Sequence, residues 1–357
     1  MRPRHSSSPA AAGRLHAREY GGQQALDFLA RRWAALTEQD AQATAYQDPG
    51  WLLAWARHLP VGHEPLVAAI WDDEQPVAAL ALVREHACSG RTRITPLSWP
   101  ASEQIRPVGE SEQAVRVRVD RLPCLADDVH VADLPDSCLL ARHAHAQWGD
   151  SDAQTLYATV PLPVDLSALS RSTRREHRRR RRLVQALGDR VAYRTSTRTD
   201  LLAAFDVLED LHHRRNALRL PTTCAADLTL PWRQVLEECP EAALVATLTL
   251  DAEPVAAQLC LTRRDRAYSL ITAMDPAHRD LSPGHALLYF LCDDLTAQGY
   301  AALDLGGTTA HDGQRAYKAP HGATWTTTRT YTPPVVLNSA KEFSSAAKSS
   351  ACSSAAQ

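Results

Sequence analysis

Lysine is nearly absent from this sequence. Of its 39 Lys and Arg residues only Lys318, Lys341 and Lys348 are lysine, so Lys318 is the only one in the first 340 residues. An ammonium group can donate to a single developing oxyanion or exchange a proton with a tunable pKa, which a planar guanidinium does less well. Lys318 is therefore a candidate functional residue, the alternative being an ordinary surface lysine.

Three further absences exclude classes of protein. The formal net charge of −2 excludes a polyelectrolyte, so any attraction to nucleic acid must come from a local patch. The eight cysteines show no CxxC or paired His/Cys spacing, which argues against a metal site and favours reduced thiols and a cytoplasmic location. No stretch approaches the ~18 apolar residues that a membrane-spanning helix needs. Residues 1–20 lack the apolar run of a secretory signal and are predicted to be a disordered leader.

An internal repeat organises the remaining chain. The length of 357 residues fits two domains of about 150 residues plus tails. Residues 66–83 align without gaps with residues 244–261, with identity at 8 of 18 positions and an offset of 178 residues. Each copy is predicted to be a β-hairpin, because two apolar runs flank an acidic turn and a proline opens the returning strand. The sequence thus predicts two copies of one α/β unit.

The second copy continues into a pattern that suits an anionic ligand. Residues 266–274 are predicted to be a third strand, followed by a loop containing Asp275, Arg279, Ser282 and Gly284. A helix is predicted from His285 to about residue 298, and a buried strand, 301–305, is expected to close at Gly306 and Gly307. A small-residue loop before a helix N-terminus presents backbone N–H groups to an anion. A phosphate-bearing donor would suit this loop.

These residues, in this order and spacing, resemble a known family. The set Asp275, Ser282-Pro283-Gly284, Asp304 to Gly307 and Tyr317-Lys318 is similar to the BioF2-like or CelD-like branch of the GNAT acyltransferase superfamily, which is related to the Fem-type peptidyltransferases. The resemblance covers roughly residues 20–332 and implies tandem α/β domains, each a twisted mixed β-sheet flanked by helices. The predicted parts are a leader (1–20) and an N-terminal half that lacks the donor loop (21–160). A basic connecting helix with the next strand (161–197), a C-terminal GNAT domain (198–334) and a disordered Ser/Ala tail (335–357) follow.

The loop departs from the acyl-CoA pattern of this superfamily. Arg279 and Gly284 match (Gln/Arg)-x-x-Gly-x-(Gly/Ala), but Ser282 replaces the middle glycine and Pro283 removes one N–H donor. The predicted donor-binding residues are Arg279, Ser282, Gly284 and His285. The donor stays open between acyl-CoA, an acyl carrier protein and an aminoacyl-tRNA, each as a co-substrate rather than a permanently bound cofactor.

The resemblance also implies roles at the transfer step. A lysine in the matching aromatic-Lys motif acts in Fem-like relatives, so Lys318 is predicted to stabilise an oxyanion or bind the donor phosphate. Tyr317 either protonates a leaving group or packs its ring beside the lysine. Asp304 either pairs with Lys318, binds the amine, or caps N–H groups of the Gly306-Gly307 turn, and Asp275 has the same ambiguity as an acceptor or polar site residue.

An arginine-rich helix is the other conspicuous segment. Residues 171–182 contain eight arginines, and Ser170 or Ser172 is expected to cap the helix. The candidate contacts for tRNA or a carrier protein are Arg174, Arg175, Arg178, Arg179 and Arg182, with Arg171 on the same broad face. The alternative is a solvated connecting helix.

Three functions fit these features. The first is an N-acyltransferase that moves an acyl group from acyl-CoA or a carrier to a small-molecule or peptide amine. The second is a Fem-like tRNA-dependent aminoacyltransferase, for which RNA binding should be sensitive to salt. The third is a GNAT-shaped scaffold without turnover that binds an acidic partner. The sequence favours the first, and it assigns neither the acceptor nor the oligomeric state.

Overall fold

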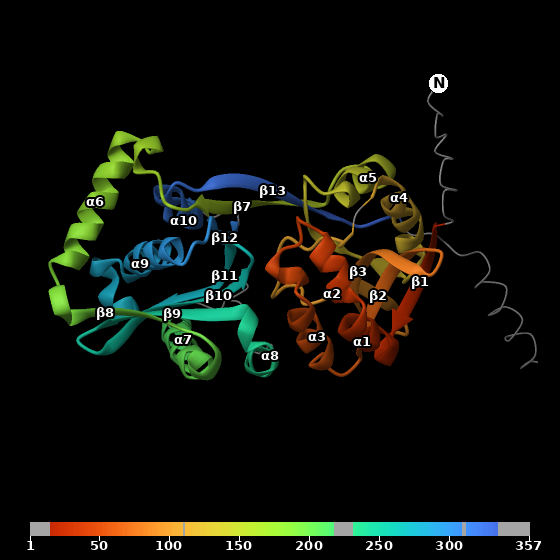
Figure 1. Ribbon diagram of the computed structural model, residues 1–357, viewed down its shortest axis with the longest axis horizontal. Helices are drawn as coiled ribbons and strands as arrows, with labels where there is room; N and C mark the ends of the chain where they lie inside the picture. The colour runs from red at the N-terminus through yellow and green to blue at the C-terminus, as the bar shows by residue number, and fades with distance from the viewer. Residues whose placement is uncertain (1–14, 110, 218–230, 309–311, 335–357) are drawn as a thin grey trace, which may run out of the picture.

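The chain folds around two β-sheets that lie beside each other along the long axis of the molecule (Figure 1). The computed structural model describes residues 15–109, 111–217, 231–308 and 312–334. The predicted Ser/Ala tail, 335–357, lies outside these ranges. Within the described residues no helix combines the length and the apolar character needed to cross a membrane.

The first sheet has five strands, all antiparallel except for the last pair. Its strands, in spatial order, are β1 (Leu15–Gly21), β2 (His63–Asp72), β3 (Gln75–His86), β4 (Thr92–Pro96) and β5 (Asp128–Val129). Its helices are α1 (Gly22–Arg31), α2 (Trp33–Gln39), α3 (Pro49–Arg57), α4 (Glu112–Arg121) and α5 (Leu139–Trp148). Alternation along β2 sends Val67 toward the α1–α2 core and Leu66 toward the α4–α5 core, so both faces of the sheet are covered.

The second sheet has eight strands in the order β6-β13-β7-β12-β11-β10-β9-β8, and only β11 and β12 pair in parallel. The strands are β6 (Val131–Pro135), β7 (Ala153–Pro161), β8 (Val191–Ser196), β9 (Ala243–Leu250), β10 (Glu253–Arg263), β11 (Arg266–Met274), β12 (Ala302–Thr308) and β13 (Thr324–Tyr331). The helices are α6 (Arg171–Gln185), α7 (Leu201–Ala217), α8 (Trp232–Glu238), α9 (Pro283–Ala297) and α10 (Asp312–Lys318). Helices α7 and α8 cover one face and α9 covers the other.

Short 3₁₀ turns connect many of these elements. They are η1 (Ala45–Gln47), η2 (Leu122–Cys124), η3 (Leu166–Ala168), η4 (Gly188–Arg190), η5 (Arg198–Asp200), η6 (Pro240–Ala242), η7 (Pro276–Leu281) and η8 (Ala319–His321). Two of them position the residues of interest, since η7 leads into α9 and η8 follows Lys318 directly.

Both predicted hairpins are confirmed. Strands β2 and β3 form the first and β9 and β10 the second, each pair antiparallel. Asp73 and Asp251 take left-handed backbone conformations in the two turns, with φ of 49° and 50°. Aspartate tolerates this conformation better than most residues, which explains an acidic turn in both copies. The third predicted strand coincides with β11, and α9 begins two residues before the predicted start because Pro283 occupies its first turn.

Two details differ from the sequence prediction. Residues 15–20, expected to belong to a disordered leader, form most of β1, which pairs with β2 from Leu15↔Asp72 to Gly21↔Leu66. The predicted division near residue 160 is also not a division between sheets, because β6 and β7 precede it and yet pair with β13 and β12 in the second sheet. The first half therefore contributes strands to the second, which ties the halves together covalently and by hydrogen bonds.

Strands β11 and β12 pair over only three residues each and then diverge. The parallel ladder runs from Arg266↔Ala302 to Tyr268↔Asp304. Beyond Asp304, strand β12 remains paired with β7 on its other side. Asp304 therefore lies where the two parallel strands separate.

Candidate functional site

Lys318 lies buried at the C-terminal end of α10. Its side chain is 6% exposed, and Nζ donates hydrogen bonds to the backbone carbonyls of Gly306 (2.7 Å) and Gly307 (2.6 Å). Burial lowers the pKa of this ammonium to about 8, while the charges of Glu103 and Asp304 act in the opposite direction. A lysine has three N–H donors, so two fixed bonds leave one for a reacting oxygen.

The two glycines that hold Lys318 are part of a strand. They were expected to close the strand that contains Asp304, but β12 continues through them to Thr308. The register with β7 shifts between Asp304 and Gly307, and Gly306 has φ of 73°. This irregularity is a bulge, and its conformation is one that glycine adopts without strain. The prediction of a terminal turn was therefore wrong, and the bulge supplies both carbonyls that hold Lys318.

Asp304 is almost fully buried beside this bulge. It accepts hydrogen bonds from the Gly306 N–H (2.7 Å), Gln104 Nε2 (2.6 Å) and Thr159 Oγ1 (3.2 Å). Burial raises the pKa of its carboxyl group, and these bonds oppose the rise. Of the predicted contacts with the glycine N–H groups, the one with Gly306 is present, and Lys318 acts on Asp304 electrostatically. A buried carboxyl group with an elevated pKa is suited to exchanging a proton.

Glu103, from the first half of the chain, is the site residue that sequence reasoning missed. Its Oε2 accepts a hydrogen bond from the Gly307 N–H (2.9 Å). Burial, followed by the charge of Asp304, raises the pKa of Glu103 to about 8. Gln104, next in sequence, bonds Asp304. The sequence contained one indication of Glu103. The 178-residue offset between the two hairpins places the predicted donor loop, 275–284, opposite residues 97–106, which include Glu103.

Further buried polar groups from β6, β7 and η1 lie near Glu103 and Asp304. Asp133 of β6 accepts a hydrogen bond from Thr328 Oγ1 (3.3 Å), and burial raises the pKa of its carboxyl group. Tyr157 of β7 and Tyr46 of η1 are buried, and the charge of Glu103 adds to burial in raising the pKa of both phenols. The site is thus assembled from both halves of the chain.

Tyr317 connects Lys318 to the predicted donor loop. Its hydroxyl donates to the Gly284 carbonyl (3.1 Å), and its ring centroid lies 4.7 Å from that of His285. Burial raises the pKa of this phenol well above its usual value. These contacts hold the ring against the donor loop, and both predicted roles, packing beside Lys318 and proton donation to a leaving group, stay predictions.

The donor loop has the predicted order but a restricted set of N–H donors. Ser282 has a left-handed conformation (φ 51°), and its carbonyl accepts from the N–H groups of His285 (3.0 Å) and Ala286 (3.2 Å). Pro283 has no N–H to offer. A Cβ on Gly284 would meet Met274 Sδ at 3.5 Å, while the Arg279 side chain is exposed. The loop can offer a guanidinium and a helix end to an anion, with fewer N–H groups than an all-glycine loop.

Asp275 lies apart from the contacts around Lys318. It accepts a hydrogen bond from the Ala277 N–H (2.8 Å), which caps η7, and it pairs with Arg214 of α7 at 3.4 Å. These contacts favour the capping interpretation over a role in binding the acceptor.

The arginine-rich helix α6 begins as predicted, with the Ser170 side chain accepting from the Thr173 N–H. It lies at the end of the second sheet that is remote from the first half and packs against α9 (Figure 1). Arg174 donates to the Ser167 carbonyl (2.8 Å), and Arg179 pairs with Glu176 (2.7 Å). The exposed arginine side chains of the predicted set are Arg171, Arg175, Arg178, Arg179 and Arg182, while Arg174 is half-buried. They form the predicted stripe without Arg174.

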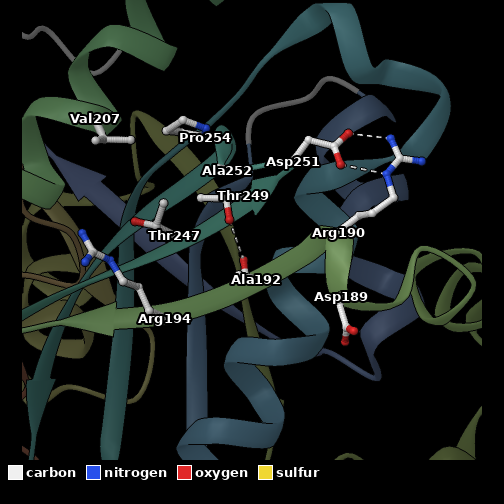
Figure 2. A pocket seen from close by; sticks show the side chains of 10 residues that line it. All are labelled: Asp189, Arg190, Ala192, Arg194, Val207, Thr247, Thr249, Asp251, Ala252 and Pro254. Carbon is white, nitrogen blue, oxygen red and sulfur yellow. Dashed lines mark hydrogen bonds and ion pairs between the residues drawn. The ribbon is translucent and has the colours of Figure 1, made fainter.

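A surface groove lies elsewhere in the second half. Figure 2 shows this groove of about 790 Å³, which β8, β9 and neighbouring residues form. Arg190 and Asp251 form an ion pair at its side, and Arg194 and Thr247 also line it. None of the predicted site residues contributes to it. Within the described ranges no group of three or more His, Cys, Asp or Glu side chains is placed to hold a metal ion.

Comparison with known proteins agrees with this geometry. Residues 171–319 match the family model described as an acetyltransferase (GNAT) domain. No curated protein matches the chain. The crystal structure of FemX superposes with a TM-score of 0.61 at 14% identity, covering 86% of this chain and 96% of that one.

Two further solved structures share the fold. The C-terminal domain of a putative lysylphosphatidylglycerol synthetase from Agrobacterium fabrum has a TM-score of 0.56 at 12% identity, covering 86% of this chain and 92% of that one. The structure of L-PGS from Bacillus licheniformis has a TM-score of 0.53 at 12% identity, covering 87% of this chain and 93% of that one. These likenesses extend over both sheets, whereas the family model covers the second half. Residues 171–319 therefore match a GNAT acetyltransferase domain, and the chain as a whole shares the two-part fold of the FemX structure.

Proposed function

We propose that this protein is an N-acyltransferase that moves an acyl group from a thioester donor, acyl-CoA or a carrier-bound acyl chain, to an amine acceptor. The observation that carries the proposal is the position of Lys318 Nζ, which the carbonyls of the β12 bulge hold within electrostatic reach of the Glu103 and Asp304 carboxyl groups. This arrangement places one cation and two proton acceptors where β11 and β12 separate.

Acyl transfer would use Lys318 and the two carboxyl groups in two steps of the reaction. When the amine attacks the carbonyl carbon of the donor, negative charge develops on the carbonyl oxygen, and the remaining N–H of Lys318 stabilises it. The attacking nitrogen must lose a proton, which the Glu103 or Asp304 carboxylate accepts. The C–S bond then breaks, and the departing thiolate takes up a proton. Glu103 is the preferred acceptor because it is less buried than Asp304.

A second candidate function is aminoacyl transfer from a charged tRNA. Two observations favour it: the exposed stripe on α6, typified by Arg175 and Arg178, and a donor loop in which Ser282 and Pro283 reduce the N–H groups facing a pyrophosphate. The transfer step would use the same Lys318, with a ribose hydroxyl rather than a thiol as the leaving group. A GNAT-shaped scaffold without turnover is the third candidate, and loss of activity on Lys318→Ala with unchanged melting would exclude it.

Ligand-induced thermal stabilisation separates the donors. The protein is melted at fixed low salt with coenzyme A or acetyl-CoA, with an acyl carrier protein, and with bulk charged tRNA. The proposal expects a shift with coenzyme A or the carrier protein, and a coenzyme A shift should disappear in Arg279→Ala. A shift with tRNA alone, lost when Arg175 and Arg178 are changed to Gln, would replace it with the aminoacyl-transfer function.

A further inference from the structure

Hydrogen bonds on both sides of Lys318 join its segment to the donor loop. Before Lys318, the Tyr317 hydroxyl donates to the Gly284 carbonyl at 3.1 Å. After it, Nε2 of His321 lies 3.0 Å from Nδ1 of His285, and one imidazole N–H, from either ring, bridges the two nitrogens. Gly284 and His285 belong to the start of α9, whereas Tyr317 and His321 belong to α10 and η8. Lys318 is thus bracketed in sequence by two residues that contact the start of α9.

His321 is held in place by the rings around it. Its side chain is buried, and its ring is stacked on that of His285, with centroids 5.2 Å apart and 17° between the planes. The ring centroids of Tyr289 and Tyr317 lie 5.0 Å and 5.9 Å from that of His321. Burial lowers the pKa of the His321 imidazole well below its usual value, and the neighbouring His285 adds to this effect. The His321 ring is therefore neutral at pH 7, which the bond to His285 requires if it is to share a single proton.

The short turn η8 links the position of His321 to that of Lys318. Lys318 is the N-cap residue of this turn and His321 is its last residue. Pro320 fixes one φ angle within it. At its end, the Gly322 N–H donates to the Ala319 carbonyl at 3.2 Å, and Gly322 has φ of 79°, a conformation that glycine adopts without strain. A turn of this length, closed in this way, has little freedom, so a displacement of His321 moves Lys318 as well.

A small displacement of Lys318 matters for its chemistry. Its Nζ lies 2.7 Å and 2.6 Å from the carbonyl oxygens of Gly306 and Gly307, and a shift of about 1 Å would break these hydrogen bonds. In the proposed reaction the acyl carbonyl, held by the loop that contains His285, must meet the remaining N–H of Lys318. A misplacement of about 1 Å between reacting groups can cost about 10²-fold in rate. A residue that connects the loop to the lysine therefore controls the separation on which transfer depends.

We propose that His321 is a positioning residue for acyl transfer, whose hydrogen bond to His285 fixes Lys318 relative to the donor loop. His321 touches neither donor nor acceptor in this role and acts through His285 and η8. The role in transfer rests on the proposed function, which assigns the loop at His285 to the donor. The effect of His321 on Lys318 itself depends on the contacts alone, so it can be measured without any substrate.

The pKa of Lys318, measured by NMR on the full chain, reports its position. Lys341 and Lys348 are the only other lysines, so isotope-labelled lysine gives few side-chain signals, and Lys318→Met identifies the one from Lys318. The unchanged protein should titrate at about 8. His321→Phe keeps a ring but removes the hydrogen bond, so Nζ should become more hydrated and its pKa should rise by about one unit or more toward its ordinary 10.5. His321→Gln, whose amide can still reach Nδ1 of His285, should reverse most of this rise.

Two further variants make the test specific. His285→Phe removes the same bond from the other side and serves if His321→Phe does not fold, because His285 is only partly buried. It should raise the Lys318 pKa by a similar amount, and the double variant should add little, since both changes break one interaction. The matched control is His143→Phe in α5, which removes a histidine hydrogen bond to Glu112 (2.8 Å) in the first half and should leave the Lys318 pKa unchanged.

An unchanged Lys318 pKa in folded His321→Phe or His285→Phe would overturn the proposal, because a lower melting temperature alone indicates a purely structural contact. An equal rise in His143→Phe would also overturn it. The proposed function is tested separately by donor-induced stabilisation. If the Lys318 pKa rises as expected but no donor binds, His321 positions Lys318 and the proposed function fails. If a donor binds and the pKa stays at about 8 in the variants, the function stands and the role of His321 fails.

Discussion

The two halves of the chain use the same position of the repeat for different purposes. In the second half, residues 275–284 leave β11 and start α9, with Arg279 exposed to solvent. The corresponding residues of the first half, 97–106, leave β4 and bring Glu103 and Gln104 to the second half instead. The loop of the second half thus has the arrangement that suits a donor, whereas the loop of the first half supplies residues to the site around Lys318.

Contacts with the rest of the first half explain how loop 97–106 reaches the second half. Arg106 anchors it to the first half by donating to Gln42 Oε1 (2.8 Å) and lying 3.7 Å from Asp40. Toward its other end, Trp51 of α3 donates from Nε1 to the Ser102 hydroxyl (2.9 Å). The loop is held on both sides, so Glu103 is fixed against the β12 bulge. A first half without these contacts could not complete the site.

The largest expected effect on activity is for Lys318, the residue that the second half contributes to the site. Lys318→Met should lower the rate of acyl transfer about 10²–10³-fold, because it removes the donor to the developing oxyanion. Lys318→Arg should not restore activity, since a planar guanidinium cannot occupy the space between the Gly306 and Gly307 carbonyls. Single-turnover rates at saturating donor measure the loss. A loss below tenfold, with melting unchanged, would contradict the role of Lys318.

Glu103→Gln tests the contribution of the first half. We expect transfer to fall about 10–100-fold, because a positioned proton acceptor contributes at least this much. The unchanged protein should be most active near pH 8, since Glu103 must lose its proton and Lys318 must keep its own, with a pKa of about 8 for each. The rise of activity toward pH 8 should be reduced in the variant. The matched control is Glu74→Gln in the exposed first hairpin turn, which should leave the pH profile unchanged.

The same variant has a predictable effect on stability. Glu103 in the folded protein keeps its proton up to about pH 8, whereas its ordinary value is 4.5. The folded state therefore binds more protons between these values, and this group's contribution to the free energy of unfolding is lost as pH rises across the window. Chemical denaturation at pH 5 and pH 8 should show a smaller decrease for Glu103→Gln than for the unchanged protein. An equal decrease would show that Glu103 titrates at its ordinary pKa.

Gly306→Ala tests how closely the two halves meet. A Cβ at this position would lie 2.7 Å from Glu103 Oε2 and 3.3 Å from the Ser269 carbonyl, on a backbone with φ of 73°. We expect a loss of about 1–3 kcal/mol in the free energy of unfolding. Gly313→Ala in α10 is the control, because nothing lies within 4 Å of its Cβ and alanine favours a helix by up to about 1 kcal/mol. Equal effects of the two substitutions would argue against the close contact.

The smallest effect concerns α6, which connects the strands contributed by the first half to the rest of the second. Changing Arg175 and Arg178 to Gln should leave thermal stability unchanged, because both side chains are exposed. If charged tRNA is the donor, each change should reduce the slope of log affinity against log salt concentration by about 0.7–0.9. An unchanged slope would remove the stripe from donor binding.

Much of the second half could be read from the sequence. The hairpins, β11, α9 and α6 all appear where periodicity, caps and turn residues predicted them, because these signals act between residues near each other in the chain. The resemblance carried by Tyr317-Lys318 and the donor loop likewise depends on short motifs. These local features led to the family and to the lysine.

The composition and the local patterns thus predicted two α/β copies, a basic helix and an isolated lysine with a role in acyl transfer. Only the tertiary structure decided that β6 and β7 pair in the second sheet, and that Glu103 contacts a glycine 204 residues away. Such contacts depend on which loop fits against which bulge, a matter of shape and buried hydrogen bonds that no local pattern encodes. The pKa values of Glu103 and Lys318 follow from the same burial and were equally invisible in the sequence.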